Sequence, residues 1–111
     1  MKKPETIAEA NKRCAEEVER IFEQMHDVLV MKAADYDGDN LRYTNLRAVE
    51  AMGIPAYKGA LIRMTDKMSR LQSLAKSQAA PAVTGETFED TLIDLANYAV
   101  ICLTLYRETQ S

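Results

Sequence analysis

Residues 85 to 98 read Gly85-Glu86-Thr87-Phe88-Glu89-Asp90-Thr91-Leu92-Ile93-Asp94-Leu95-Ala96-Asn97-Tyr98. Glu86, Asp90 and Asp94 are spaced four residues apart, and Asn97 continues the series. On an α-helix these four side chains lie on one face, which we call the acidic face. The rest of the segment is apolar enough to be buried. An ionised carboxylate that is buried without a partner is costly, so the acidic face is expected to meet cations.

The same segment predicts a helix over residues 87–107. Thr87 followed by Asp90 three residues later resembles a capping arrangement at its start. From Leu92 to Tyr106 the helix is apolar around most of its circumference. One small bundle leaves part of such a surface uncovered, so we expect a homo-oligomer.

Apolar periodicity predicts two more long helices, over residues 4–34 and 55–77. A short helix is predicted between them, over residues 44–52. Pro4 and Pro55 suit the first turns of the long helices. Thr44 is the expected N-cap of the short helix and Gly53 its C′ residue.

Turn-forming residues separate these helices. The run Asp35 to Asn40 is expected to end the first helix, and residues 78–85 to form a loop. Because no alternating strand pattern occurs, the sequence predicts an all-α fold, a small antiparallel bundle of three long helices and one short helix. Its 111 residues suit a single helical domain, residues 1–111.

The formal net charge is −3, from 14 Lys and Arg against 17 Asp and Glu. General duplex binding depends on a basic surplus, so the chain is not expected to bind duplex nucleic acid.

Cys14 and Cys102 lack the spacing of a zinc or redox motif and are expected to be reduced core thiols. Charged residues at the N-terminus argue against a signal peptide, and the most apolar stretch is shorter than the about twenty residues that cross a bilayer. A cytoplasmic protein without membrane contact is therefore expected.

The acidic face has two possible cationic partners. Asp90 and Asp94 offer the oxygen ligands that Mg²⁺ takes together with substrate phosphates. Arg63, Lys67 and Arg70 recur along one side of the predicted helix 55–77 and are suited to polyphosphate, so a metal-bridged nucleotide would fit between the two helices. The alternative is that Lys67 and Arg70 pair directly with Asp90 and Asp94 as internal salt bridges.

The run from Asp35 to Asn40 resembles a calcium-binding EF-hand loop in composition only. Gly38 comes too early in the run, and no Glu occupies the twelfth position, so calcium binding is not expected. The run is either a turn held by Asx hydrogen bonds or a loop that contacts substrate, with Tyr36 and Tyr43 beside it available to stack on a base. A second acidic stripe on the first helix is expected to be solvated and comprises Glu16, Glu19, Glu23 and Asp27.

Three motifs follow one another between about residues 21 and 106. They are Lys32-Ala33-Ala34-Asp35-Tyr36, Arg63-Met64-Thr65-Asp66-Lys67-Met68-Ser69-Arg70-Leu71, and the segment from Glu86 to Tyr98. Together they resemble the phage-rich family called nucleotide modification associated domain, first type. This resemblance implies a role in phage nucleotide metabolism or DNA modification. The substrate-binding candidates are then Lys32, Asp35, Tyr36, Arg63, Lys67, Arg70 and Asn97.

The helical layout is also similar to the all-α nucleoside triphosphate pyrophosphatases, the MazG and dimeric dUTPase group. These enzymes cleave NTPs to NMP and pyrophosphate with Mg²⁺ held by carboxylates from two helices, in the motifs Glu-Glu-x-x-Glu and Glu-x-x-Asp. Here Glu16-Glu17-Val18-Glu19-Arg20 lacks the last acid of the first motif, and Glu89 replaces Asp in the second. The metal cluster of the pyrophosphatases therefore cannot be assigned to residues of this chain. Asp90, Asp94 and Asn97 remain as site candidates, because they belong to the motif of the nucleotide modification family itself.

Two functions are compatible with these residues. The first is a Mg²⁺-dependent nucleoside triphosphate pyrophosphohydrolase, in which Asp90 and Asp94 hold the metal and Glu86 assists or orients water as the third catalytic candidate. The second is a non-catalytic sponge that binds a nucleotide or cyclic nucleotide and sequesters a host immune signal, in the host cytoplasm if the gene is phage-borne. A structural or interaction bundle is a third possibility.

Overall fold

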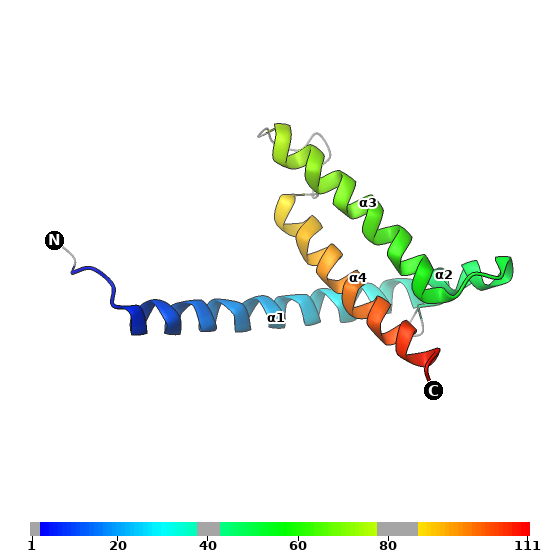
Figure 1. The fold of residues 1–111 in the computed structure, drawn as a ribbon, viewed down its shortest axis with the longest axis horizontal. Helices are drawn as coiled ribbons and strands as arrows, with labels where there is room; N and C mark the ends of the chain where they lie inside the picture. The colour runs from blue at the N-terminus through cyan, green and yellow to red at the C-terminus, as the bar shows by residue number, and fades with distance from the viewer. Residues whose placement is uncertain (1–2, 38–42, 78–86) are drawn as a thin grey trace.

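The computed structural model describes residues 3–37, 43–77 and 87–111, without the side chains of residues 33–37 and 77. The elements over these ranges are helical, with no strand among them, which confirms the all-α prediction (Figure 1). In chain order they are α1 (Ile7–Asp37), α2 (Thr44–Arg47), the 3₁₀ helix η1 (Ala48–Met52), α3 (Ala56–Ser77) and α4 (Phe88–Glu108).

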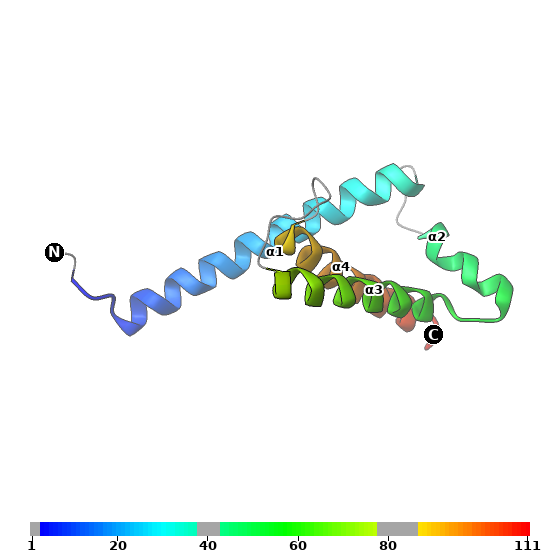
Figure 2. The same cartoon turned by 90° about the horizontal axis from the view of Figure 1, so that it is seen from above.

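Helices α3 and α4 form an antiparallel pair, and α1 crosses α4 on one side of that pair (Figures 1 and 2). The N-terminal half of α1 projects beyond the pair. The molecule is therefore elongated, with extents of 63 × 37 × 24 Å and a radius of gyration of 17.7 Å. A compact domain of this length has a radius of gyration of about 13 Å. The fold is more open than the small bundle that the sequence predicts.

The hydrophobic core is small and lies where α2 and the start of α3 meet the second half of α4. Leu105 is its most enclosed large side chain, at 2% exposure. The buried members are Tyr43, Leu46, Ala56, Ala60, Ile101 and Leu105. Cys102 packs against this core as predicted, and burial raises the pKa of its thiol. Cys14 is exposed instead, because none of the described helices packs against the projecting half of α1.

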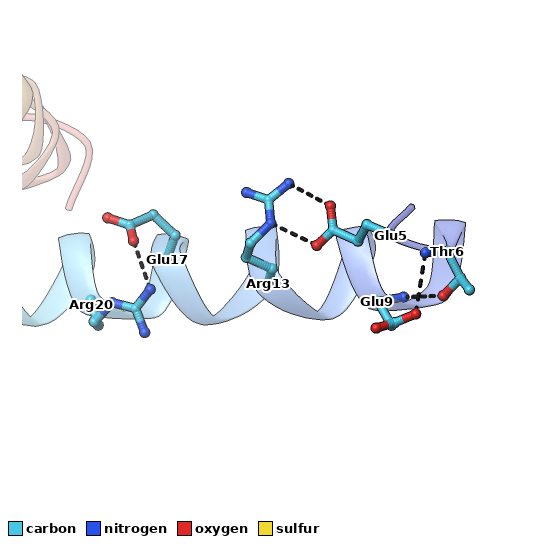
Figure 3. Close-up of polar contacts among 6 residues, drawn as sticks. All are labelled: Glu5, Thr6, Glu9, Arg13, Glu17 and Arg20. Atoms are coloured by element: carbon cyan, nitrogen blue, oxygen red, sulfur yellow. Dashed lines mark hydrogen bonds and ion pairs between the residues drawn. The ribbon is translucent and has the colours of Figure 1, made fainter. Parts of the chain in front are cut away.

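Helix α1 starts later and ends later than predicted. Thr6 and Glu9 form a reciprocal capping box: the Thr6 amide donates to Glu9 Oε1 at 3.2 Å, and the Glu9 amide donates to Thr6 Oγ1 at 3.1 Å (Figure 3). The helix therefore begins at Ile7, and Pro4 lies outside its first turn. At the other end, residues 35–37 of the predicted turn are helical. Residues 38–40 lie outside the described ranges.

The remaining helix ends follow the predicted signals closely. Gly53 has φ of 76° and caps η1, as expected of a C′ glycine. Helix α3 runs from Ala56 to Ser77 directly after Pro55. Thr87 caps α4 in a capping box with Asp90. The short helix differs by one residue at its start, since its N-cap is Tyr43 rather than Thr44.

Candidate functional site

A cavity of about 100 Å³ lies where α1, α2, α3 and α4 converge, and we call it the central cavity. Its apolar surface comes from Leu29, Leu46 and Ile101. The polar and aromatic side chains around it are Lys32, Tyr43, Asn45, Arg63, Lys67, Asp94, Asn97 and Tyr98. All three family-like motifs thus contribute at least one side chain to a single site.

Asp94 lies between two lysines in this cavity. Its Oδ1 atom is 2.6 Å from Lys32 Nζ, and its Oδ2 atom is 3.3 Å from Lys67 Nζ. The Asp94 side chain is 16% exposed and that of Lys67 19%, so solvent screens this contact less than a surface ion pair. The internal salt bridge between Lys67 and Asp94 is therefore present, as one interpretation of the sequence expected. Lys32, from α1, is a second partner that this interpretation did not include.

The described side chains that line the central cavity carry a surplus of positive charge. Lys32, Arg63 and Lys67 contribute three positive charges, and Asp94 contributes one negative charge. The difference, three minus one, is two positive charges in a partly enclosed space. Such a site attracts anions, because the low-dielectric walls of a cleft concentrate the field of its charged residues.

Asp90 lines a second cavity, of about 310 Å³, between α1 and α4, which we call the side cavity. The Thr87 amide donates to Asp90 Oδ2 at 3.3 Å, and the Asp90 amide donates to Thr87 Oγ1 at 3.0 Å. One carboxylate oxygen of Asp90 is thus already used to cap α4. Lys32 and Asp94 line both cavities, so their ion pair lies at the boundary between the two.

Asn97 is buried, with 6% exposure, and its Nδ2 atom donates to the Met25 carbonyl oxygen of α1 at 3.0 Å. This bond joins α4 to α1 beside the central cavity. Asn97 was predicted to bind substrate. Its amide nitrogen holds the wall of the cavity, and because Asn97 also belongs to the cavity lining, its contact with substrate stays a prediction.

The other predicted site residues are distributed unevenly. Arg63 and Lys67 line the central cavity, whereas Arg70, half-buried on the same helix, is not among its described lining residues. Asp35 and Tyr36 are helical at the end of α1, but the description does not extend to their side chains. Glu86 lies outside the described ranges, so its catalytic role stays a prediction.

Tyr43 has an unusual backbone conformation, with φ of 56° and ψ of 48° in the left-handed region. Its side chain is 8% exposed and packs in the core beside the central cavity. A bulky residue in this region costs of order 1–3 kcal/mol and persists only where the surroundings enforce it. The backbone is therefore held under strain at the cavity wall. Neither this conformation nor the neighbouring Asn45 was marked by any pattern in the sequence.

The described carboxylates do not fit a resident Mg²⁺ ion as they are arranged. Within the described ranges, no group of three or more His, Cys, Asp or Glu side chains is placed to hold a metal. Both oxygens of Asp94 face ammonium groups, which repel a divalent cation, and one oxygen of Asp90 is bonded to the Thr87 amide. Mg²⁺ can also arrive with a substrate, bound by the substrate phosphates and by only one or two carboxylates of the protein. The arrangement of Asp90 and Asp94 is compatible with that second kind of binding.

Residues 56–105 match the model of the family described as Nucleotide modification associated domain 1. The family predicted from the motifs is thereby confirmed over this stretch, which contains the second motif and the third. The first motif, Lys32 to Tyr36, precedes the matched region. No curated protein and no solved structure matches the chain. The similarity to the MazG and dimeric dUTPase group stays a prediction.

Across the residues described, no helix has both the length and the apolar character that crossing a bilayer requires.

Proposed function

We propose that the protein binds a phosphorylated nucleotide, with the phosphates in the central cavity. The observation that carries this proposal is the cationic surplus of Lys32, Arg63 and Lys67 over Asp94 in the cavity lining. Lysine and arginine side chains are the usual partners of phosphate oxygens, through charge-assisted hydrogen bonds. The family description, which refers to nucleotide modification, supports the ligand class.

The size of the site is consistent with a nucleotide that enters only in part. The central cavity of about 100 Å³ is smaller than the about 300–1,000 Å³ of ligand pockets, so it suits the phosphates. The base and sugar would then lie against Tyr43 and Tyr98 or extend toward the side cavity. A phosphate that binds Lys67 competes with Asp94 for the same ammonium group.

Mg²⁺-dependent hydrolysis of a nucleoside triphosphate is a second candidate. It is favoured by the side cavity, where Asp90 and Asp94 both contribute to the lining next to Lys32. When bound with the triphosphate, Mg²⁺ would neutralise phosphate charge and lower the pKa of a water molecule. A phosphate that drew Lys67 away from Asp94 would make one carboxylate oxygen available, and Glu86 precedes Asp90 by four positions in the sequence.

A non-catalytic sponge for a nucleotide or cyclic nucleotide is the alternative. The paired state of Asp94 favours it, because the cationic surplus exists without a metal. A sponge would bind its ligand equally well in the presence of a chelator, whereas the enzyme would need the metal for turnover.

Isothermal titration calorimetry tests nucleotide binding. The native protein is titrated with nucleoside mono-, di- and triphosphates and with cyclic dinucleotides, once with EDTA and once with Mg²⁺. We expect binding in EDTA that weakens with added salt, and a loss of about tenfold or more in the variants Lys67→Gln and Arg63→Gln. Lys76→Gln is the matched control, because Lys76 is exposed near the end of α3 and does not line the cavity.

If no phosphorylated ligand binds, or if Lys76→Gln weakens binding as much as Lys67→Gln, the central cavity is not the site. Release of pyrophosphate from any NTP or dNTP, abolished by Asp94→Asn, would establish the enzyme. If the protein binds a nucleotide but hydrolyses none of those tested, the non-catalytic sponge is the function that remains.

A further inference from the structure

The side of the α3–α4 pair that faces away from α1 carries a largely apolar surface, with Thr65, Ser69 and Gln72 as its polar members on α3. Two adjoining depressions follow the line between the helices, and Leu61 and Met64 take part in both. We call this surface the outer groove and define it by Leu61, Met64 and Met68 on α3 and Leu95, Leu103 and Tyr106 on α4. Leu103 is 49% exposed and Tyr106 44%. Tyr106 is nevertheless held in place by an edge-on ring contact with Tyr57, with a centroid distance of 5.3 Å.

The projecting half of α1, residues 7–23, is a second unpartnered surface, which we call the arm (Figure 1). Every residue of the arm is exposed except Ala10, which is half-buried. Ile7, Cys14, Val18 and Ile21 lie at helical spacing on the face of α1 that also carries Met25, the residue bonded to Asn97. The apolar stripe that packs on α4 thus continues along α1 beyond the crossing of the two helices, where no described element covers it (Figure 1).

The other face of the arm is polar. Arg13 pairs with Glu5 at 2.9 Å and Arg20 pairs with Glu17 at 2.6 Å (Figure 3). With the capping box at Thr6 and Glu9, these contacts support a helix of two distinct faces. An isolated helix of this length is marginal in water, so a partner for its apolar face is expected.

The accessible surface shows how much area a partner could cover. The chain exposes 8533 Å², whereas a compact monomer of its mass exposes about 6,200 Å². The excess of about 2,300 Å² is well above the about 800 Å² that each partner contributes to a standard interface. The unpartnered surface is therefore large enough for a permanent dimer.

We propose that a second copy of this chain covers the outer groove, and that its arm is the segment that lies there, in a reciprocal exchange between two copies. The arm extends about 25 Å, and the outer groove follows α4 for about 17 Å from Leu95 to Tyr106, so the groove can seat about two thirds of the arm. Reciprocal docking covers both apolar surfaces at once and leaves the polar face of the arm in water. The interface is separate from the proposed nucleotide site and does not depend on it.

The two cysteines of the chain provide a direct test, since Cys14 lies on the arm and Cys102 lines the outer groove. Cys14 is about 16 Å along α1 from Met25, where α1 meets α4, so a short linker cannot join it to Cys102 of the same chain. We expect a short bismaleimide to give a covalent dimer of the native protein. Because burial raises the pKa of Cys102, the reaction is run at alkaline pH and repeated with Leu103→Cys in a Cys102→Ser background.

Single variants show which surfaces meet. Cys14→Ser and Cys102→Ser should each abolish the cross-link, and Leu103→Cys should restore it. If Cys102→Ser still gives a dimer through two copies of Cys14, the arms meet each other and the proposal is wrong.

Light scattering during size-exclusion chromatography provides the second measurement. The native protein should have twice the 12.5 kDa mass of one chain. Val18→Glu on the arm and Leu103→Glu in the groove should each give a monomer, and the helical circular dichroism should fall by no more than the contribution of the uncovered arm. Val30→Glu is the matched control, because Val30 is 45% exposed on the other face of α1, and it should remain a dimer. A monomeric native protein, or dimers of both Val18→Glu and Leu103→Glu, would overturn the proposal.

Discussion

The ammonium group of Lys32 lies 2.6 Å from the carboxylate of Asp94, although 62 positions separate the two residues. This contact joins α1 to α4 and lies at the boundary of both cavities. Lys67 forms an ion pair with the second oxygen of the same carboxylate. Asp94 therefore links three helices and also sets the charge of the proposed phosphate site.

Replacement of Asp94 by Asn tests both roles. The shape is kept, but Lys32 and Lys67 lose their common counter-charge, and we expect a loss of about 1–3 kcal/mol in the free energy of unfolding. Without Mg²⁺ the variant should bind a triphosphate roughly tenfold more tightly, because one negative charge is removed from beside the phosphates. Calorimetry measures the affinity, and Asp66→Asn on the exposed side of α3 is the control. Weaker binding in EDTA would contradict the proposed placement of the phosphates.

Replacement of Asn97 by Ala tests the hydrogen bond between α4 and α1. The Met25 carbonyl loses its side-chain donor and a small void opens beside it, so we expect a loss of about 1–3 kcal/mol in urea unfolding. Thr104→Ala is the control, because the Thr104 hydroxyl bonds only to the Val100 carbonyl of its own helix. Equal losses in the two variants would show that the contact with α1 contributes nothing specific.

The features that the sequence predicted well are those with local signals. Gly53 follows an apolar segment and takes the left-handed conformation expected of a helix end. Thr87 with Asp90 marks the start of α4, and Pro55 marks the start of α3. Thr6 with Glu9 is the same kind of signal, but Pro4 suggested an earlier start. Each of these signals depends on residues a few positions apart, so the rest of the fold is not needed to read it.

The features that the sequence could not predict depend on how the helices cross. Helical spacing places Arg63, Lys67 and Arg70 on one side of α3, yet only the first two line the central cavity. The same spacing gives no sign that Asp94 meets Lys32, because the crossing of α1 over α4 fixes that contact. A periodic pattern defines a face of a helix and leaves open which element covers it.

Replacement of Asp90 by Asn separates its capping role from a metal role. Asn keeps an oxygen that can accept from the Thr87 amide, so stability should fall by only a few tenths of a kcal/mol, whereas Thr87→Ala should cost about 1 kcal/mol. Thermal unfolding measures both. If Asp90→Asn removes a Mg²⁺-dependent gain in triphosphate affinity while stability is kept, Asp90 binds the metal; if that gain persists, its role is structural.

Replacement of Gly59 by Ala tests how closely α2 and η1 approach α3. A Cβ atom there would lie 3.0 Å from the Leu46 carbonyl oxygen and 3.2 Å from a Val49 methyl group. The backbone carbonyl cannot move aside easily, so we expect a loss of about 1–3 kcal/mol and weaker nucleotide binding, since Leu46 lines the central cavity. Gly53→Ala is the comparison: nothing lies near its Cβ, and only the positive φ costs about 1 kcal/mol. Unchanged stability of Gly59→Ala would contradict the close contact.

The ion pair between Arg47 and Glu108 gives a dependence of stability on pH. The two terminal guanidinium nitrogens, Nη1 and Nη2, donate to the carboxylate at 3.0 and 2.9 Å, and these hydrogen bonds hold the pKa of Glu108 below its ordinary value of 4.5. A carboxyl group with a lowered pKa stabilises the fold above its ordinary pKa, and the contribution is lost as the pH falls through the lowered value.

Urea unfolding of the native protein and of Glu108→Gln, from pH 7 to pH 3, tests this dependence. The native protein should be slightly more stable at pH 7, and the difference should shrink below about pH 4.5 as Glu108 takes up a proton. Because the Glu108 side chain is half exposed, added salt should also reduce the difference. The control is Glu19→Gln, an exposed position on the projecting half of α1. A difference between native protein and Glu108→Gln that stayed constant down to pH 3 would mean that the pair does not stabilise the fold through the charge of Glu108.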